Sequence, residues 1–405
     1  MMNSKGVAFI IILALAFIFA GIAHADLNDW LVAYYPFNGN ANDESGNGNN
    51  GTAYGGISYV DGVMGQAASL DGINDYIRIS QSDTLNNLQT MTITYWIKYY
   101  KPVSGDSNVA VTICNGEDKP VPFVDGFYTY ACMEGIHHYL GKWGDATGVC
   151  TPIDATVPVS EQSYTFVVFL VTEDKIKTYK NGNFIEENDR EGRNISRPQE
   201  DWYIGRNGSF SMYYLNGHID DIRIYNRALT DSEIKTLSYV SPPSHDYGIK
   251  AVDYLSTQLF TFTNTSSETI TLGTLSITGT DNAEFYLQSD NCSGIALEPS
   301  ESSTFEVVFE PASLGAKAAT VNIPSNLGID ALEVSLRGLV TEPCECDLNN
   351  DGSCNVFDWY VFIEDWGRTD CSSDCECDLN NDGSCNVFDW FIFIEDWGRT
   401  DCPVN

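Results

Sequence analysis

The chain has 405 residues, with 56 acidic against 21 basic side chains and a net charge of −35. A field of that sign repels nucleic acid and anionic membrane surfaces, so the composition excludes both as partners and favours cations. With 43% hydrophobic and 12% aromatic residues, the chain can build real cores, and its length suggests two to four domains.

The N-terminal segment has the layout of a secretory signal peptide. Lys5 supplies a positive charge, an apolar run follows over 7–22, and Ala23-His24-Ala25 has the small side chains of a cleavage site. Because the run is short for a membrane span, we expect cleavage after Ala25 rather than an uncleaved anchor. Residues 1–25 are therefore predicted to be removed, with no membrane span left in the exported chain.

Residues 26–240 are predicted to be β throughout. The stretch TMTITYWIKYY alternates between two faces, one of which carries Met91, Ile93, Tyr95, Ile97 and Tyr99. The run SYTFVVFLV is typical of a buried strand, and Asn181-Gly182 is the dipeptide of a tight hairpin turn. Many short strands separated by turn residues indicate a β-sandwich or a jelly roll.

Five segments of this block can be compared with known motifs. In chain order they are LVAYYPFNGNANDESGNGNNGTAYGG, AASLDGINDYIRIS, TITYWIK, IKTYKNG and GHIDDIRIYNRALTDSEI. Together they resemble the successive motifs of the laminin-G-like (concanavalin A-like) jelly-roll family. The resemblance implies two antiparallel sheets and a module that binds carbohydrate or glycoprotein. It also implies a setting in bacterial surface proteins and enzymes, where such modules are non-catalytic.

The same fold hosts glycoside hydrolases, whose carboxylates project from one strand with E-x-D-x-E spacing. Glu187, Asp189 and Glu191 match that spacing. However, Asn188 and Arg190 stand between them, where those enzymes have buried apolar residues. We therefore expect a solvated hairpin end and no catalytic site, with a polysaccharide-degrading enzyme or its accessory subunit as the alternative.

Other side chains of this block are candidates for ligand binding. The pair His137-His138 has no acidic or cysteine neighbours at metal spacing, so a surface pair is expected. Exposed aromatic rings could stack on sugars, with a place in a core or on a sheet as the alternative for Trp96, Tyr100, Trp143, Tyr213 and Tyr214.

Three aspartates of the jelly roll are candidates for a calcium site within this block. If its first and last strands pair, Asp43 could share a cation with Asp220 or Asp221. Loop capping and ordinary surface charge are the alternative.

Residues 241–343 are predicted to form a second β-sandwich behind a Pro/Ser linker, SPPSHD at 241–246. Alternating strands follow over about 95 residues, the size of one immunoglobulin-like domain. The stretch FTFTNTSSETITLGTLSITGTDNAEFYLQSDNCSG resembles the choice-of-anchor D type of Ig-like domain, which implies a spacer or interaction module. The second cysteine of that family falls at Ser303 here, so Cys292 lacks a local partner.

The last block, residues 344–405, contains a duplication. CECDLNNDGSCNVFDWYVFIEDWGRTDC at 344–371 returns at 375–402, with changes only at Tyr360/Phe391 and Val361/Ile392. Counted from the first aspartate, oxygen-bearing residues fall at positions 1, 3, 5, 7, 9 and 12 with glycine at 6, the spacing of an EF-hand calcium loop. The predicted Ca²⁺ ligands are Asp347, Asn349, Asp351, Ser353, Asn355 and Asp358, then Asp378, Asn380, Asp382, Ser384, Asn386 and Asp389. A polar turn is the alternative.

Each loop is followed by apolar residues at helical spacing, in the first copy Trp359, Phe362, Ile363 and Trp366. A calcium loop with a trailing helix, present twice, resembles the dockerin module. This implies docking onto a cohesin-like receptor or another surface protein. Dockerins commonly carry small hydroxylated residues at loop positions 10 and 11, whereas this chain has Val356-Phe357 and Val387-Phe388.

Eight of the twelve cysteines lie in this repeat block. Zinc is the alternative to disulfides, but Cys344-x-Cys346 is tighter than the usual zinc spacing. Disulfides that staple units without large cores are expected, with a connectivity that the spacing does not choose. Of Cys114, Cys132, Cys150 and Cys292, we expect two to pair and two to stay free, with a bridge from Cys292 to the first domain as the alternative.

The sequence therefore predicts a mainly β, secreted or surface-attached bacterial protein. A jelly roll (26–240), an Ig-like sandwich (241–343) and small Cys-rich loop-helix calcium repeats (344–405) follow the signal peptide. A structural matrix protein is the remaining alternative.

Overall fold

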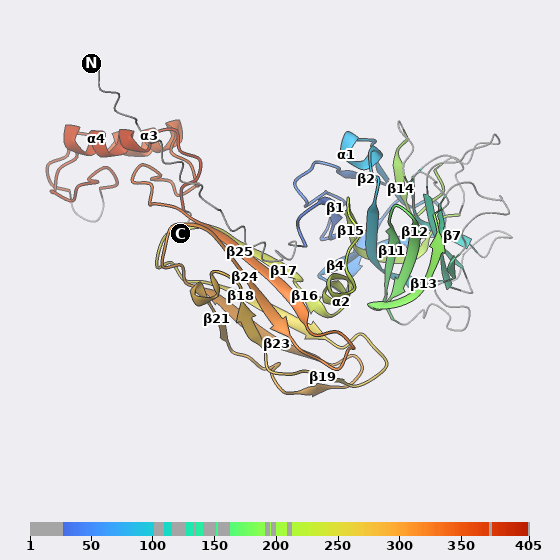
Figure 1. Cartoon of the computed structure of the whole chain (residues 1–405). Helices are drawn as coiled ribbons and strands as arrows, with labels where there is room; N and C mark the ends of the chain where they lie inside the picture. The colour runs from blue at the N-terminus through green and yellow to red at the C-terminus, as the bar shows by residue number, and fades with distance from the viewer. Residues whose placement is uncertain are drawn as a thin grey trace, which may run out of the picture.

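The fold is that of a computed structural model of the chain (Figure 1). It describes residues 27–100, 109–115, 127–132, 135–140, 151–152, 163–190, 195, 200–208, 213–371 and 375–403. The expected signal peptide, Trp143, Cys150 and Glu191 lie outside these residues. Among the helices in the described ranges, none has both the length and the apolar character needed to cross a bilayer.

The first module consists of two antiparallel sheets. The eight-stranded sheet runs β13-β12-β11-β6-β15-β4-β3, with β1 also paired to β15. Its strands are β1 (Leu31–Tyr35), β3 (Ser58–Asp61), β4 (Gln66–Asp71), β6 (Met91–Tyr99), β11 (Thr165–Val171), β12 (Lys175–Lys180), β13 (Asn183–Asp189) and β15 (Asn216–Tyr225). The seven-stranded sheet runs β10-β9-β8-β7-β14-β5-β2. Its strands are β2 (Gly51–Tyr54), β5 (Tyr76–Ile79), β7 (Val109–Asn115), β8 (Phe127–Cys132), β9 (Gly135–Leu140), β10 (Thr151–Pro152) and β14 (Trp202–Ile204).

The core of this module lies between the two sheets. The face of β6 that the alternation predicts, every second residue from Met91 to Tyr99, is buried there together with Trp202 and Ile77 of the opposite sheet. The hairpin between β12 and β13 turns at Asn181-Gly182, where both residues have the positive φ (47° and 74°) of a type I′ turn. The predicted mainly β jelly roll is confirmed.

The eight-stranded sheet is covered on its outer face as well. Helix α2 (Asp231–Tyr239) begins with a capping box in which Thr230 and Glu233 satisfy each other's backbone N–H groups. Its Ile234 and Leu237 pack with Trp96 and Phe166 of the sheet in a second buried cluster. Every residue of β11 is buried, because this strand has cover on both faces.

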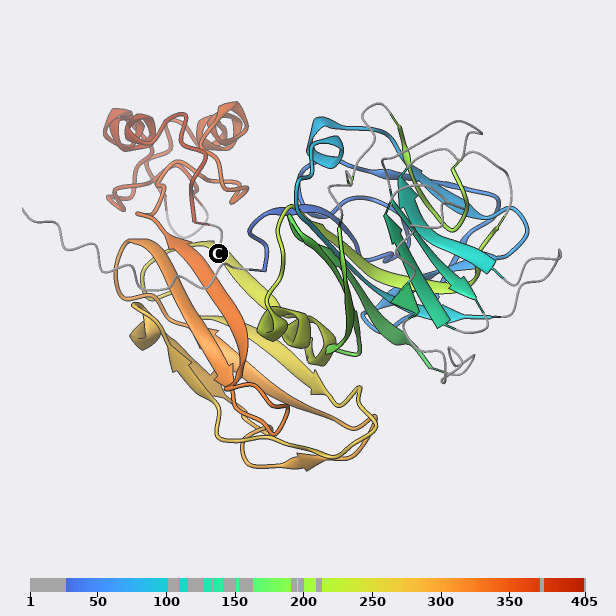
Figure 2. The same cartoon turned by 45° about the vertical axis from the view of Figure 1, so that its right-hand side comes forward.

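The second module is a β-sandwich with its own core. One sheet runs β16-β18-β23-β21 and the other β17-β25-β24-β20, with a β19–β22 pair beside them. Its elements are β16 (Val240–Ser241), β17 (Ser244–Lys250), β18 (Ser256–Thr263), β19 (Ile270–Thr271), β20 (Ser276–Thr278), η1 (Asn282–Glu284), β21 (Phe285–Gln288), β22 (Ala296–Leu297), β23 (Ser302–Phe309), β24 (Gly315–Ile323) and β25 (Leu332–Val340). The sandwich lies between the jelly roll and the C-terminal repeats (Figures 1 and 2).

The predicted linker at 241–246 is wrong. This segment contributes to both sheets, since β16 pairs with β18 and β17 pairs in parallel with β25. Pro242 and Pro243 lie between these two strands, each of which is at the edge of its sheet, where a missing backbone N–H is tolerated. The Pro/Ser composition therefore marks edge strands and a turn, and α2 leads into the sandwich without a spacer.

Helix α2 also contacts the sandwich directly. Nζ of Lys235 donates to the Leu327 carbonyl at 2.6 Å, and the hydroxyl of Ser232 donates to the Ala331 carbonyl at 3.2 Å. At the end of the helix, Tyr239 belongs to the sandwich core, where it stacks on Phe262. One helix thus covers the jelly roll and joins it to the second module.

The C-terminal repeats contain two helices, α3 (Val356–Glu364) and α4 (Val387–Glu395). Their buried cluster consists of disulfide cysteines with Phe362 and Phe393, whose rings lie 4.7 Å apart. The hydroxyl of Thr341, which directly follows β25, donates to the carbonyl of Asp401 at 2.9 Å and so ties the end of the repeats to the end of the sandwich.

Candidate functional site

In the two predicted calcium loops, side-chain oxygens accept hydrogen bonds from backbone N–H groups of the same loop. In the first, the N–H of Asp351 donates to Oδ1 of Asp347 and to Oδ1 of Asn349, each at 3.0 Å, and the N–H of Gly352 donates to Oδ2 of Asp347 at 3.0 Å. The loop turns through positive φ at Asn350 (57°) and Gly352 (88°). Glycine adopts this conformation without steric cost, so position 6 has the residue that the turn requires. The oxygens of positions 1 and 3 converge on this turn.

Position 12 joins the loop to helix α3. Asp358 is fully buried, and its two carboxylate oxygens accept from the N–H of Asn349 at 3.1 Å and of Asn355 at 2.8 Å. Asn355 is the N-cap of α3 and Asp358 its third residue, so the two form a capping box. One buried carboxylate therefore connects the middle of the loop to the start of the helix.

The second loop repeats this geometry. Asp389 is fully buried and accepts from Asn380 at 3.1 Å and Asn386 at 2.8 Å. Asp378 accepts from the N–H groups of Asp382 at 3.0 Å and Gly383 at 2.9 Å. Two copies with the same contacts indicate that the loop sequence itself dictates the conformation.

Each loop concentrates negative charge without a basic partner. Asp347, Asp351 and Asp358 form no ion pair among the described residues, because the arginines of this block, Arg368 and Arg399, pair with aspartates that follow the helices. No group of three or more His, Cys, Asp or Glu side chains in the described ranges is gathered closely enough to hold a metal. An EF-hand-type loop also uses amide and backbone carbonyl oxygens. The donor set of hard oxygens around a glycine turn therefore fits Ca²⁺.

The two repeats interlock through backbone hydrogen bonds. The N–H of Cys354 donates to the carbonyl of Arg399 at 2.8 Å, and the N–H of Gly398 donates back to Cys354 at 2.9 Å. In the same way, the N–H of Cys385 donates to the carbonyl of Arg368, and the N–H of Gly367 donates to the carbonyl of Cys385, each at 2.9 Å. Each loop is thus bound to the segment that follows the other repeat's helix, so neither repeat is complete alone.

All eight cysteines of the repeats form disulfides, as expected, and zinc has no thiolate left to bind there. The pairs are Cys344–Cys402, Cys346–Cys354, Cys371–Cys375 and Cys377–Cys385. Elsewhere Cys114 and Cys292 are free and buried, so the alternative bridge from Cys292 is not formed. Burial raises the pKa of the Cys114 thiol to about 12, which makes it a poor nucleophile.

The two helices of the repeats expose a matched apolar surface, which we call the helix face. It consists of Val356, Phe357, Tyr360, Ile363 and Trp366 from the first repeat and Val387, Phe388, Phe391, Ile394 and Trp397 from the second. Phe357 and Phe388 are 63% and 64% exposed. Val356, Tyr360 and Ile363 follow helical spacing and so share one side of α3, and large exposed apolar patches mark interaction sites in soluble proteins.

The three jelly-roll aspartates have separate partners. Asp43 accepts from the N–H groups of Tyr34, Ser45 and Asn49, each at 2.9 Å, so it caps its own loop. Asp221 is buried and paired with Arg223 at 3.1 Å. Asp43 therefore has the loop capping that formed part of the alternative to a shared calcium, whereas Asp221 belongs to a buried ion pair and is not ordinary surface charge.

Asp220 is also buried, beneath the turn between β3 and β4. Its Oδ2 accepts from the N–H groups of Val63 at 2.7 Å and Met64 at 3.0 Å, whereas its Oδ1 has no hydrogen-bond partner within the described part of the chain. Burial raises the pKa of this carboxyl to about 7, the two N–H donors lower it, and the charge of Asp221 raises it. Burial of the charged form of this carboxyl therefore costs folding free energy.

The seven-stranded sheet presents tyrosines and an arginine on the side away from the core, which we call the tyrosine face. The rings of Tyr54 and Tyr76 stack at 4.7 Å. The guanidinium of Arg206 lies 4.0 Å from the ring of Tyr76 and 4.7 Å from that of Tyr203. Nε of Arg206 is buried without a hydrogen-bond partner, and no described acidic side chain pairs with this residue.

Sequence reasoning missed these residues, although a signal was present. In YIRI at 76–79 the buried residues are Ile77 and Ile79, so Tyr76 must lie on the opposite side. In WYI at 202–204 the same argument places Tyr203 there. The alternation of these short strands was available from the sequence, but the pairing that puts them side by side was not.

The aromatic residues proposed from sequence have other roles. Trp96 is 3% exposed beneath α2, 5.0 Å from the ring of Phe166, so its assignment as an exposed ring is wrong. Tyr100, Tyr213 and Tyr214 are half-buried. The expected surface pair is also wrong for His138, which is buried with Nδ1 3.0 Å from the hydroxyl of Thr178, because β9 turns this side chain toward the opposite sheet.

The hydrolase-like carboxylates lie on an exposed edge strand. Glu187 and Asp189 are on β13, the outermost strand of its sheet. Both pair with Lys175, at 3.5 and 2.9 Å. They are exposed and already compensated by a lysine, which is the solvated hairpin end that the sequence suggested.

Two facing antiparallel sheets with the last long strand paired to the first define a jelly roll. Residues 71–235 match a family model described as the concanavalin A-like lectin/glucanases superfamily. No curated protein sequence matches the chain.

Solved structures similar to this chain include domain 4 of AbnA, a GH43 extracellular arabinanase from Geobacillus stearothermophilus, in complex with arabinotriose. It shares 23% identity over 51% of this chain and 98% of its own, with a TM-score of 0.41. The binding domain of Paraclostridial Mosquitocidal Protein 1 shares 17% identity over 74% and 76%, with a TM-score of 0.44. The CBM40 of the Ruminococcus gnavus IT-sialidase bound to α2,3-sialyllactose shares 19% identity over 37% and 83%, with a TM-score of 0.31. The jelly-roll assignment rests on the sheets and the family match rather than on these scores.

Proposed function

We propose that the protein is an extracellular modular binding protein whose jelly roll binds carbohydrate or glycoprotein through the tyrosine face. The observation that carries this proposal is the cluster of Tyr54, Tyr76, Tyr203 and Arg206 on the sheet whose outer side α2 does not cover. Aromatic rings offer flat apolar surface to a sugar ring, and the terminal N–H groups of Arg206, which has no acidic partner among the described residues, can donate to the sugar's oxygens.

A glycan array probed with the purified mature chain tests this proposal. The variant Tyr54→Ala should lose most of the bound signal, because Tyr54 is the exposed end of the stack. Tyr286→Ala removes a tyrosine of similar exposure (41% against 37%) from the sandwich and should bind like the wild type. A blank array would favour a structural matrix protein, and release of soluble sugars would favour a glycoside hydrolase.

For the C-terminal repeats we propose Ca²⁺ binding by the two loops. Three carboxylates per loop without a basic partner repel one another, and a divalent cation would offset that repulsion. Asp347, Asn349, Asp351 and Asp358 would supply side-chain oxygens, and Ser353 its backbone carbonyl. Calcium would then hold the first loop to its helix at Asp358 and the second at Asp389, where hydrogen bonds already join loop and helix.

We also propose that the helix face docks the protein onto a cohesin-like receptor or another surface protein. Its exposed apolar side chains support a protein partner, and the exposed Glu364 and Glu395 at the ends of the two helices favour a partner with basic residues there. Surface plasmon resonance against an immobilised cohesin module, with calcium and with chelator, tests the partner class. Phe357→Asp together with Phe388→Asp should abolish the signal if the helix face is used.

A further inference from the structure

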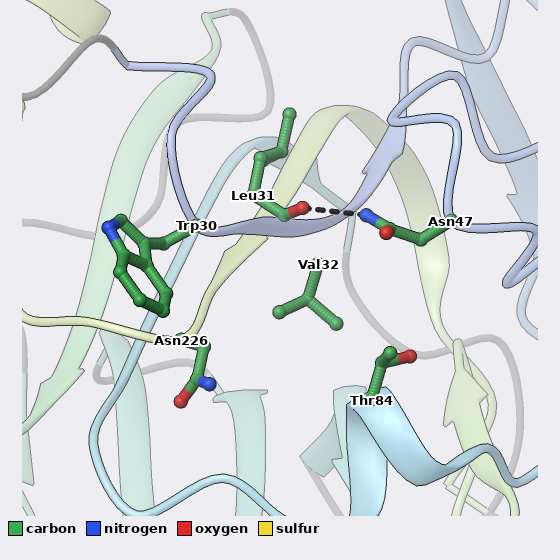
Figure 3. Close-up of a pocket in the computed structure, with 6 residues that line it drawn as sticks. All are labelled: Trp30, Leu31, Val32, Asn47, Thr84 and Asn226. Carbon is green, nitrogen blue, oxygen red and sulfur yellow. Dashed lines mark hydrogen bonds between the residues drawn. The ribbon is translucent and has the colours of Figure 1, made fainter.

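A small pocket lies beside β1, a strand of the eight-stranded sheet, whereas the tyrosine face belongs to the seven-stranded sheet. Its volume is about 190 Å³, and its lining residues come from β1 and from three separate connections: Trp30, Leu31, Val32, Asn47, Thr84 and Asn226. Figure 3 shows the indole of Trp30 on one side, Asn47 and Thr84 on the other, and Asn226 below. Thr84 belongs to the short helix α1 (Asp83–Asn86).

Trp30 is exposed to a degree that is unusual for tryptophan. Its side chain is 66% exposed, the highest value among the described tryptophans. Its backbone has φ of 65°, a conformation that costs a non-glycine residue energy. The carbonyl of Trp30 accepts from the N–H of Asn226 at 2.9 Å, which fixes this strained residue immediately before β1. The fold therefore presents the indole at the rim of the pocket instead of burying it.

The polar groups of the pocket are amides and a hydroxyl. Nδ2 of Asn47 donates to the Leu31 carbonyl at 2.7 Å, so this amide is held in place, while its Oδ1 accepts no hydrogen bond from the described residues. The side-chain amide of Asn226 makes no hydrogen bond to the described part of the chain. Val32, which is 6% exposed, supplies an apolar surface between them.

None of the described residues that line the pocket is charged, so an ionic ligand would find no counter-charge among them. A flat indole, an apolar base and uncommitted amide groups suit a ligand with one apolar face and several hydroxyl groups. The volume is below the range of about 300–1,000 Å³ that is typical of pockets for drug-sized ligands, so one ring fits better than a buried chain.

We propose that this pocket binds a single neutral sugar ring, stacked on Trp30 and hydrogen-bonded by Asn47 and Asn226. The ring would be a free monosaccharide or the terminal residue of a glycan. This site shares no residue with the tyrosine face, so each can fail without the other.

Calorimetric titration of the full mature chain tests the proposal. The probes are glucose, galactose, mannose, xylose, arabinose and N-acetylglucosamine, with glucuronate as the charged control. Trp30→Ala should lower the affinity for the bound sugar at least about tenfold, because it removes the stacking surface. Trp366→Ala removes another exposed tryptophan, from the helix face, and should have no effect.

Three further measurements sharpen the result. Asn226→Ala should weaken binding while leaving the thermal unfolding curve unchanged, since its side chain supports no described contact. Tyr54→Ala should leave monosaccharide binding intact. Methyl glycosides should bind like the free sugar if the ligand is a terminal residue, and fail if the free reducing sugar is required. The proposal is overturned if no neutral sugar binds at tens of millimolar, if glucuronate binds equally, or if Trp30→Ala binds as well as the wild type.

Discussion

Asp358 and Asp389 accept backbone hydrogen bonds and are also predicted calcium ligands. Replacing both by alanine tests how much each of these two roles contributes to the stability of the repeats. Each accepts hydrogen bonds from two backbone N–H groups at 2.8 and 3.1 Å. Hydrogen bonds to a charged group contribute about 1.5–3 kcal/mol each, but these are only partly buried and water can satisfy the freed N–H groups, so we expect each repeat to lose about 1–3 kcal/mol even without a metal. The four disulfides should keep the variant loosened rather than wholly unfolded.

Calcium should widen this difference. With three carboxylates per loop and the short Asp at position 12, the wild-type dissociation constant is expected at about 10⁻⁵ to 10⁻³ M. Calcium at 100 times that constant would stabilise the wild type by about 2.7 kcal/mol for each site. The double variant lacks the ligand that joins loop and helix, so it should gain no measurable stability from millimolar calcium.

The assay is calorimetric titration of the chelator-treated chain with calcium, paired with thermal unfolding with and without the ion. Asp370→Ala with Asp401→Ala is the matched control, because it removes two aspartates that follow the helices and pair with arginines instead of loop N–H groups. If the wild type takes up no calcium, or if the double variant takes up as much as the wild type, the loops are acidic turns with capping boxes. The calcium proposal would then fail.

Three other predictions concern stability. The folded-state pKa of Asp220, about 7, lies above that of an unfolded aspartate, so the folded state favours the protonated form and this residue lowers stability as pH rises from about 4 to about 7. Asp220→Asn should therefore be more stable than the wild type at pH 8 but not at pH 4 in urea unfolding; an equal difference at both pH values would contradict this. The disulfide Cys344–Cys402 spans 58 residues, so Cys344→Ser with Cys402→Ser should lower the stability of the repeats by about 4 kcal/mol, without moving the jelly-roll transition in calorimetry. Residues 26–240 expressed alone should fold, since the core between the sheets lies within them, but should melt below the intact chain because α2 loses its contacts with the sandwich; an insoluble fragment would show that the two modules fold as one.

Much of the jelly roll was predictable because a strand records its surroundings in its own residues. The alternation in β6 predicted which of its side chains lie in the core. The continuous, largely apolar run of β11 indicated a strand that is buried on both faces. The calcium-loop spacing was equally local, since the positive φ at Gly352 and the cap at Asp358 involve residues only a few positions apart. Such features depend on the chain within one turn or one strand.

The sequence could not place residues whose surroundings come from distant parts of the chain. Trp96 faces away from the core, and only the position of α2 determines that this side is buried. Pro242 and Pro243 have a linker composition, and only the pairing of β16 and β17 shows that they connect two edge strands.

The tyrosine face and the Trp30 pocket depend on tertiary structure in the same way. Tyr54, Tyr76 and Tyr203 are spread over about 150 residues of sequence, and the order β14-β5-β2 brings them together. The disulfide Cys344–Cys402 depends on tertiary structure as well, because the packing of the two repeats brings its distant cysteines together, whereas the other three pairs join cysteines 4 or 8 residues apart. By itself the sequence determined local conformation and the faces of strands. Tertiary structure decided which faces meet solvent, because burial belongs to the pair of surfaces in contact and not to either one alone.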